Sequence, residues 1–459
     1  QYIESYEILP LREVDDYSFH QTLNLMRNYW DDNNIYDYFF SIEQGYGYGV
    51  SWWGLVHITT NLINEVSWRL ASPRFLSIAF AVWGVLIIFY GIRKNSVLLA
   101  LFASLFFLSS QTLIFASFRF HNHTFIFFLS VLCFYISVYK SERIFLLTAI
   151  TGFATGIKIT FLPFGIFFVL KALLSSPRLS WRKYSLVAGL MTYSWLVAIS
   201  PPNLLLFPAY RTVPKYFAEV FDVIHRNEGS FTTLSWWELE NLFGNYYGLN
   251  SIALLALLSL IIYSAVFAIK KRDLDLGFGF FGSLGLFLYT MIFVSTRSHE
   301  WDAAMYALPG SLILILVIVQ LYQKSAKNQK IVITFLAFVI SGSALMKISQ
   351  NHQFLFSFYT SEERKEKDIQ KKAIVQEAKQ YLKTFSRSYK IFVHYDYPVP
   401  LHHSNPNQKV TFNLKEDLEE QDICSFLISE GEVDVPGLQI LNRIGNGYFG
   451  YFEEFCPDL

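Results

Sequence analysis

Long apolar segments follow one another through most of this chain, and short polar loops separate them. A helix needs roughly 20 apolar residues to cross a bilayer, and only 16% of the residues are charged, fewer than in a typical soluble protein. The segments are residues 73–92, 97–117, 123–139, 144–158, 160–174, 184–205, 250–269, 276–295, 303–322 and 331–347. We therefore expect an α-helical polytopic membrane protein with about ten spans.

The two segments within residues 144–174 are shorter than the others. They contain Pro163 and also Lys158, which is the one cation that we identify between apolar runs. A charge inside a membrane is costly and usually functional. We therefore expect a broken or re-entrant element, buried within the protein rather than exposed to lipid.

The loops alternate in charge along the chain. The basic loops carry Arg93-Lys94, Lys140/Arg143, Arg178/Arg182/Lys183, Lys270-Lys271-Arg272 and Lys324/Lys327/Lys330. Positively charged short loops remain on the cytoplasmic side. The remaining polar segments are then extracytoplasmic: residues 1–72, 118–122, 206–249, 296–302 and 348–459. We expect a multi-pass protein of the bacterial inner membrane.

The first extracytoplasmic loop, residues 1–72, contains apolar residues at helical spacing. Phe19, Leu23, Met26 and Trp30 predict an amphipathic helix on the membrane surface. The sequence begins with Gln and no apolar span precedes residue 10. We expect a further transmembrane helix upstream of this loop. The spans themselves form a second domain, residues 73–347, interrupted by the extracytoplasmic loop 206–249.

Residues 348–459 are expected to form a small extracytoplasmic α/β domain. Ile374, Ala378, Tyr381 and Leu382 lie on one face of a predicted helix. Alternating apolar runs then predict strands at Lys390–Tyr395, Val410–Leu414, Ser425–Ser429, Leu438–Ile444 and Tyr448–Glu453. Cys424 and Cys456 would pair if this domain lies in an oxidising compartment, which the sequence does not settle.

An acidic pair, Asp15-Asp16, lies at the start of the surface helix, on the expected outer side of the membrane. A carboxylate there could take the proton from an acceptor hydroxyl or amine, and its neighbour could hold the acceptor or a divalent cation. His20, one turn later, could bind phosphate or orient a carboxylate. The alternative is that Asp16 is an ordinary N-cap and His20 an ordinary surface residue.

Cations on the same side of the membrane could bind a lipid phosphate. Arg119, Arg297 and His299 lie at the ends of predicted spans, and Lys158 could lie at the outer interface. A phosphate that leaves as an anion is stabilised by such groups. The alternative is that the arginines are helix-end anchors whose head groups reach the interface.

Soluble nucleotide chemistry is not indicated. The sequence has no Walker A loop, dinucleotide glycine fingerprint or zinc pattern, and the cytoplasmic loops are short. The formal net charge of zero gives no general attraction to nucleic acid. An activated donor for a transferase would therefore reach the outer side in lipid-linked form.

Several segments together resemble the GT-C superfamily of integral-membrane glycosyltransferases, and in particular its protein O-mannosyltransferase and aminoarabinose-transferase branch. The similar segments are Leu11–His20, with Asp16 where the family usually has Glu, then Tyr46–Trp53, Ser67–Arg74, Gly152–Phe161 and Ser298–Pro309. The resemblance covers residues 11–322.

The resemblance implies an inverting sugar transfer from a polyprenyl-phosphate donor to a lipid, glycan or protein acceptor. Asp15 would be the general base and Asp16 would assist it, while Arg119, Lys158 and Arg297 would face the lipid phosphate. An alternative is a catalytically inactive scaffold that keeps the GT-C fold within a membrane complex and presents its outer domain to partners. A transporter is disfavoured because no inverted repeat is evident.

Overall fold

A computed structural model gives the fold of the protein. It describes residues 66–117, 122–175, 180–199, 247, 249–294 and 300–360, and, towards the C-terminus, parts of 370–394 together with 408–411, 424–430, 437–445 and 447–456. The chain divides near residue 352 into two compact units, a helical unit and a C-terminal unit.

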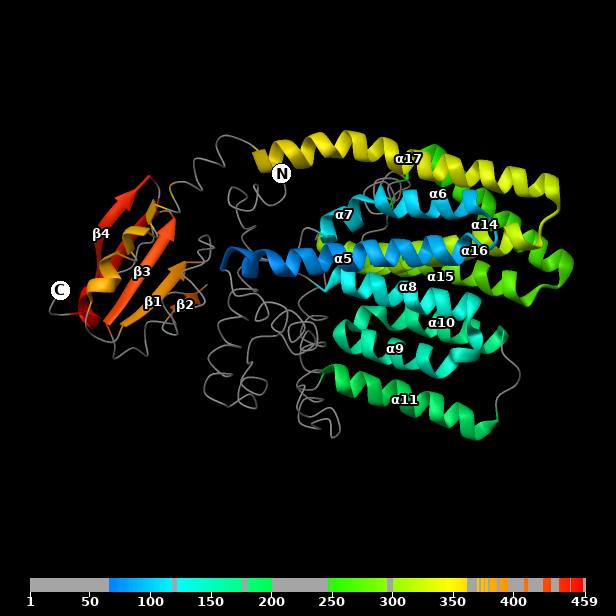
Figure 1. Ribbon diagram of the computed structural model, residues 1–459, viewed down its shortest axis with the longest axis horizontal. Helices are drawn as coiled ribbons and strands as arrows, with labels where there is room; N and C mark the ends of the chain where they lie inside the picture. The colour runs from blue at the N-terminus through cyan, green and yellow to red at the C-terminus, as the bar shows by residue number, and fades with distance from the viewer. Residues whose placement is uncertain are drawn as a thin grey trace. The chain divides into compact units, whose positions relative to one another are not determined.

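The helical unit is a bundle of apolar helices that run back and forth along one direction (Figure 1). They are α5 (Val66–Ile92), α6 (Val97–Leu108), α7 (Gln111–Ser117), α8 (His123–Tyr139), α9 (Ile144–Ile157), α10 (Leu162–Ser175), α11 (Trp181–Ile199), α14 (Ser251–Lys271), α15 (Leu274–Val294), α16 (Glu300–Lys324) and α17 (Lys327–Thr360). Each predicted apolar segment is helical over most of the part that the structure describes. Within the described residues, Phe75–Ile92, Ser251–Lys271, Ala307–Lys324 and Lys327–Met346 are long and apolar enough to cross a membrane.

Some predicted boundaries are wrong. The segment 97–117 is not one helix, because Ser109 and Ser110 separate α6 from α7. The Ser109 hydroxyl donates to the Leu105 carbonyl, and the Ser110 hydroxyl accepts from the Leu113 N–H, so both helix ends are satisfied locally. Helix α17 extends to Thr360, beyond the predicted end at residue 347, and α16 begins at Glu300 rather than at residue 303.

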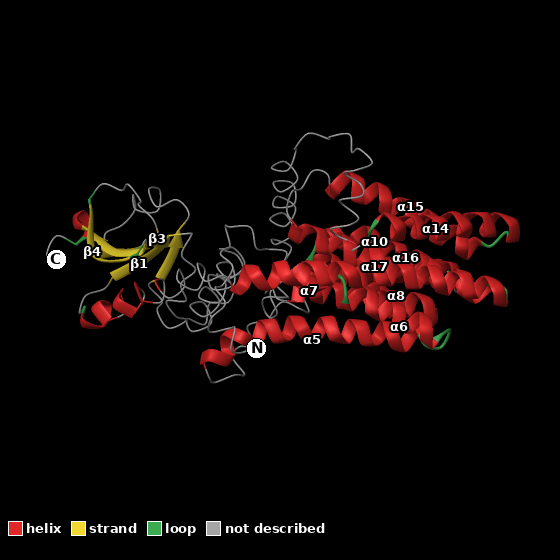
Figure 2. Cartoon of the chain, turned by 90° about the horizontal axis from the view of Figure 1, so that it is seen from above, coloured by secondary structure: helices red, strands yellow, loops and turns green. Residues whose placement is uncertain are grey.

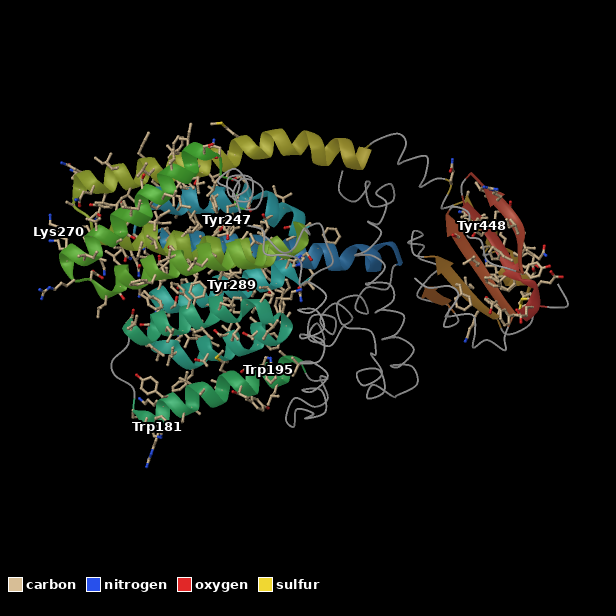
Figure 3. The ribbon with its side chains drawn as sticks, turned by 180° about the vertical axis from the view of Figure 1, so that it is seen from behind. Trp181, Trp195, Tyr247, Lys270, Tyr289 and Tyr448 are labelled. Atoms are coloured by element: carbon tan, nitrogen blue, oxygen red, sulfur yellow. A yellow bond between two sulfur atoms is a disulfide. The ribbon has the colours of Figure 1, made fainter. Side chains whose placement is uncertain are left out.

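Four of the predicted basic loops meet at one end of the bundle, which we call the basic end. Asn95, in the α5–α6 turn, donates to the Tyr139 hydroxyl at the end of α8 (3.0 Å) and accepts from Gln323 at the end of α16 (2.8 Å). Lys324 binds Asp273, which follows α14. Lys270 and Trp181 lie at this same end in Figure 3. The assignment of the basic end to the cytoplasm stays a prediction.

The C-terminal unit contains a five-stranded sheet with the order β2-β1-β3-β5-β4. Strands are confined to this unit among the described residues (Figure 2). They are β1 (Tyr389–His394), β2 (Gln408–Thr411), β3 (Cys424–Glu430), β4 (Leu438–Ile444) and β5 (Gly447–Phe452). Strand β1 pairs in parallel with β2 and β3, whereas β5 is antiparallel to β3 and β4. The predicted strands are confirmed to within a few residues.

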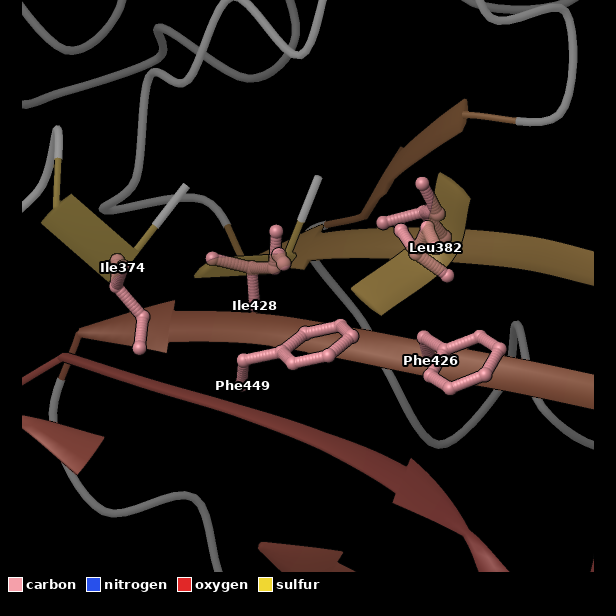
Figure 4. Close-up of a cluster of buried hydrophobic side chains, with 7 residues drawn as sticks. Ile374, Leu382, Phe426, Ile428 and Phe449 are labelled. Atoms are coloured by element: carbon pink, nitrogen blue, oxygen red, sulfur yellow. The ribbon is translucent and has the colours of Figure 1, made fainter. Parts of the chain in front are cut away.

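The core of this unit lies between the sheet and the helical residues of 370–384. Ile374 and Leu382 pack on Phe426, Ile428 and Phe449 of the sheet (Figure 4). The rings of Phe426 and Phe449 stack at 5.6 Å, because β3 and β5 are neighbours and their residues alternate between the two faces. The helical face predicted from Ile374, Ala378 and Leu382 is confirmed.

Cys424 and Cys456 form a disulfide that ties the start of β3 to the end of the described chain. The sequence did not settle whether these two cysteines pair, and the structure shows that they do. Disulfides persist mainly in oxidising compartments, which agrees with the expectation of an extracytoplasmic domain. The third cysteine, Cys133, is buried in α8 with a free thiol.

Candidate functional site

Lys158 is the one predicted site residue that the structure describes. It lies between α9 and α10, where a short 3₁₀ turn, Ile159–Phe161, replaces the helix. The other predicted site residues lie outside the described residues: Asp15, Asp16, His20, Arg119, Arg297 and His299. Lys158 therefore marks the described part of the candidate site, and the roles of the other six residues stay predictions.

The chain breaks at Lys158 for local reasons. Lys158 has an extended backbone (φ −150°, ψ 111°); its N–H still donates to the Ala154 carbonyl, and its own carbonyl accepts from the Phe161 N–H. Branched residues on either side, Ile157 and Ile159, lose side-chain freedom in a helix. Pro163 lies in the first turn of α10, where a missing N–H costs little. The predicted break in residues 144–174 is confirmed.

Two glycines hold α9 close to α11 just before the break. A Cβ atom at Gly152 would collide with the Met191 carbonyl, and one at Gly156 would collide with the Trp195 carbonyl and with Ala198. Small residues four apart commonly permit such close approach of membrane helices. The Gly152–Phe161 segment, one of those with a family resemblance, therefore has a packing role: it fixes the carboxyl end of α9 and hence the position of Lys158.

Asn122 connects the break to the amino end of α8. Its amide donates a long hydrogen bond, 3.5 Å, to the carbonyl of Ile157, the last residue of α9. It does not cap its own helix with its side chain. Asn122 and the next residue, His123, are both buried. The amino end of α8 therefore lies at the same end of the bundle as Lys158. Arg119 lies three residues before Asn122 in the sequence, outside the described residues.

Tyr289 of α15 contacts the break from another side. Its hydroxyl donates to the carbonyl of Thr160 (3.2 Å), and its ring packs edge-on against Phe164 of α10. Helix α15 ends shortly afterwards at Val294, and residues 295–299 carry Arg297 and His299. The structure thus brings the helix ends that flank Arg119 and Arg297 to the end of the bundle where Lys158 lies. We call it the break end.

The electrostatics of the break end favour a cation there. The carboxyl end of a helix carries partial negative charge, and Lys158 directly follows the last residue of α9. Asn122 and Tyr289 both donate to main-chain carbonyls that the broken helix exposes. These neutral donors satisfy the broken backbone while the Lys158 side chain stays half-exposed. Such an arrangement can place an ammonium group beside an anionic ligand.

Some of these residues were missed from the sequence. The sequence gives no sign of a role for Asn122 in the break, because that role depends on Ile157, 35 residues later. Tyr289 lies inside a predicted span and nothing in its local sequence distinguishes it. Lys171 was also missed: it is buried in α10 and binds Asp275, so Lys158 is not the one cation between apolar runs.

A metal centre is not indicated among the residues that the structure describes, which contain no group of three or more His, Cys, Asp or Glu side chains placed to hold an ion. Asp15 and Asp16, the residues considered as ligands of a divalent cation, lie outside the described residues.

Comparison with known proteins gives a result at the level of the fold. No protein-family model matches the sequence, and no curated protein matches it. Two crystal structures of ArnT from Cupriavidus metallidurans are similar to the whole chain, one in the apo state and one bound to undecaprenyl phosphate. They have 10% and 9% sequence identity, both have a TM-score of 0.53, and each match covers 98% of this chain and 95% of ArnT.

At this identity the likeness concerns the fold and does not transfer the activity. It agrees with the apolar helices in describing an integral membrane protein with a small C-terminal sheet. The resemblance noted from the sequence motifs is confirmed to this extent, since ArnT is an aminoarabinose transferase of the GT-C type. This chain therefore has the fold of the two ArnT structures.

Proposed function

We propose that this protein is a membrane glycosyltransferase that moves a sugar from a polyprenyl-phosphate donor to an acceptor at the break end of the bundle. The observation that carries the proposal is the fold, which the chain shares over its whole length with a protein crystallised with undecaprenyl phosphate. The second support is Lys158, a cation on a broken helix that Asn122, at the amino end of α8, and Tyr289, near the carboxyl end of α15, both contact through its neighbouring backbone.

The proposed reaction is an inverting displacement. The acceptor oxygen or nitrogen attacks the anomeric carbon, and Asp15 removes its proton as the new bond forms. The bond from the anomeric carbon to the phosphate oxygen breaks, and its electron pair leaves with the polyprenyl phosphate. Asp16 holds the acceptor beside Asp15. This assignment rests on the motif Leu11–His20 and on the fold.

The leaving phosphate gains negative charge as the bond breaks, so cations that contact it lower the barrier. Lys158 has this role in the proposal, with Arg119, Arg297, His20 and His299 as further contacts. Asn122 and Tyr289 act as positioning residues, because they hold the backbone on both sides of Lys158. The acceptor is a lipid, a glycan or a protein on the outer side of the membrane.

The test measures transfer of a radiolabelled sugar from a polyprenyl-phosphate donor by purified protein in detergent. We expect Asp15→Asn to abolish transfer while donor binding and thermal stability persist. Lys158→Gln should weaken binding of undecaprenyl phosphate about tenfold or more, since a charge-assisted contact is worth roughly 1.5–3 kcal/mol. Lys158→Arg should keep part of the affinity.

Lys140→Gln is the matched control, because Lys140 lies at the basic end and its only described ion pair, with Glu142, is long and exposed. It should leave donor binding unchanged. If wild type transfers no sugar from any donor, and undecaprenyl phosphate does not raise its unfolding temperature, the transferase proposal is wrong and the inactive scaffold is the better description.

A further inference from the structure

We infer that the two turns at the basic end formed by α14–α15 and α16–α17 bind the head groups of anionic phospholipids. The cations concerned are Lys270, Lys271 and Arg272 in the first turn, and Lys327 and Lys330 in the second. We call these five residues the basic turn patch. The inference concerns the opposite end of the bundle from the proposed transferase site and does not depend on that activity.

The two turns lie side by side because an ion pair joins them. Lys324, at the end of α16, donates to both carboxylate oxygens of Asp273 at 2.6 and 2.5 Å. Its ammonium group is also 3.7 Å from Asp275. Cations that precede Asp273 in one turn and follow Lys324 in the other therefore gather in one region. Figure 3 shows Lys270 at the extreme of the bundle, where its side chain points away from the helices.

The acidic residues nearest to the patch are already neutralised. Asp273 is bound by Lys324, and Asp275 is bound by the buried Lys171 at 3.2 Å. The sequence has no other Asp or Glu in residues 250–294 or 303–360. Each of these two carboxylates is paired with a lysine outside the patch rather than with one of the five patch cations. An anion from outside the protein is the ligand that this excess charge favours.

Large apolar side chains directly flank the first turn. Ile269 and Leu274 stand on either side of Lys270–Arg272 and are each 80% exposed. The same combination recurs at the start of α11, where Trp181, also 80% exposed, precedes Arg182 and Lys183. A soluble anion would gain nothing from these side chains. A phospholipid would, because its phosphate meets the cations while its glycerol and upper acyl region cover the apolar groups.

Arg272 occupies a position that backbone geometry normally gives to glycine. It is the residue after α14 and adopts the left-handed conformation (φ 51°, ψ 41°), the one non-glycine with positive φ among the described residues. Glycine is preferred there because a Cβ atom is strained in this conformation. Arg272 is therefore strained in this turn, and together with Lys270 and Lys271 it forms a run of three consecutive exposed cations.

The experiment compares the binding of fluorescent phosphatidylglycerol and phosphatidylcholine by the purified full chain in an uncharged detergent. We expect tighter binding of phosphatidylglycerol, weakened by about 0.5 M salt because exposed charges are screened. Arg272→Gly should weaken it about fivefold, and Lys270→Gln/Lys271→Gln/Arg272→Gly about a hundredfold, since each cation near a lipid surface contributes a similar amount.

Arg272→Gly separates lipid binding from folding, because glycine suits the left-handed turn and the variant should unfold at the same or a higher temperature in detergent alone. Lys383→Gln removes one exposed charge from the C-terminal unit and should not change lipid binding. Equal binding of the two lipids, or unchanged phosphatidylglycerol binding by the triple variant, would overturn the inference. So would competition by inorganic phosphate at concentrations similar to those of the lipid, which would indicate a soluble-anion site.

Discussion

The two ends of the helical bundle use their polar residues in different ways. At the basic end, side chains bind other side chains: Lys171 and Lys324 pair with Asp275 and Asp273, and Asn95 joins Tyr139 to Gln323. At the break end, the described side chains of Asn122 and Tyr289 bind main-chain carbonyls next to Lys158. The basic end thus ties helix to helix, whereas the break end supports an irregular backbone.

This difference indicates which end can hold the sugar donor. The ion pairs at the basic end join α10, α15 and α16 to each other. At the break end, neutral donors support the backbone, and the cation sits on the interrupted chain itself. Non-helical backbone within a membrane protein is tolerated where it is buried or lines a cavity. The comparison predicts that substitutions in the ion pairs of the basic end change stability, whereas those at the break end also change donor binding.

The largest effect is expected from Lys171→Met at the basic end. The Lys171 side chain is 5% exposed and lies 3.2 Å from Asp275, so the substitution leaves a carboxylate without its buried partner. Breaking a buried ion pair costs roughly 3–5 kcal/mol. Asp275 is 38% exposed and keeps Lys324 nearby, so we expect about 2–3 kcal/mol, measured by thermal unfolding in detergent.

Lys140→Met is the control for that measurement. Lys140 is 3.9 Å from Glu142, and both side chains are largely exposed, at 41% and 66%. Such pairs contribute about 0–1 kcal/mol. A Lys171→Met variant as stable as Lys140→Met would contradict the view that the basic end is fixed by its ion pairs. Adding Asp275→Asn to Lys171→Met should recover part of the loss.

At the break end, Gly152→Ala should cost about 2 kcal/mol, because overpacking of a close interface costs roughly 1–3 kcal/mol. The added methyl meets the main chain of Met191, which cannot move without shifting α11. The carboxyl end of α9 should then shift together with Lys158. We expect weaker binding of undecaprenyl phosphate as well as a lower unfolding temperature.

Gly189→Ala, on α11, is the matched control. The added methyl group would meet no atom within 4 Å beyond the nearby backbone of its own helix, and alanine favours a helix over glycine by about 0.5–1 kcal/mol. This variant should be as stable as wild type or slightly more so, with unchanged lipid binding. Equal behaviour of the two alanine variants would show that close packing of α9 on α11 does not position Lys158.

Tyr289→Phe removes one hydroxyl and keeps the ring against Phe164. The loss of a hydrogen bond to a main-chain carbonyl should cost about 1 kcal/mol. If Tyr289 positions the break, Tyr289→Phe should bind undecaprenyl phosphate more weakly than wild type. The loss of binding free energy should then exceed the small loss of stability. Tyr193→Phe on the exposed side of α11 provides the comparison. Equal donor affinity in Tyr289→Phe and wild type would limit Tyr289 to a structural role.

The sequence was sufficient to predict the helices and turns at both ends of the bundle. It was not sufficient to predict the contacts between those helices. Apolar length located the helices, Lys158 with Pro163 located the break, and the basic loops identified the turns that share one end. The interruption at Ser109–Ser110 was missed, because two serines in an apolar run do not by themselves end a helix; here each hydroxyl caps one of the two helix ends.

The contacts that define the site depend on residues far apart in the sequence. Asn122 meets Ile157, Tyr289 meets Thr160 across 129 residues, and Lys171 meets Asp275 across 104. None of these pairs follows from local periodicity, since each requires the packing of separate helices. The strands of the C-terminal domain were easier to predict because alternation within a strand is local.

The smallest effect concerns the pH dependence of the basic end. Burial opposes ionisation of Asp273, but the hydrogen bonds from Lys324 and from the N–H groups of Leu276 and Asp275 outweigh it, so its pKa lies below the ordinary value of 3.8. The folded state therefore binds this proton more weakly than the unfolded state. The stabilisation from Asp273 is complete above pH 3.8 and is lost as the pH falls through the lower pKa of the folded state.

Asp273→Asn isolates this contribution from that of the other carboxylates. The variant should be less stable than wild type near neutral pH, and the difference should shrink as the pH falls below about 4, because wild type then loses the charge that the variant lacks. Thermal unfolding of both proteins across this range measures the difference directly. A constant difference at all pH values would mean that Asp273 stabilises the turn as a hydrogen-bond acceptor alone. The ion pair with Lys324 would then not be what joins the α14–α15 turn to α16, and the contrast between the two ends would rest on Lys171 and Asp275.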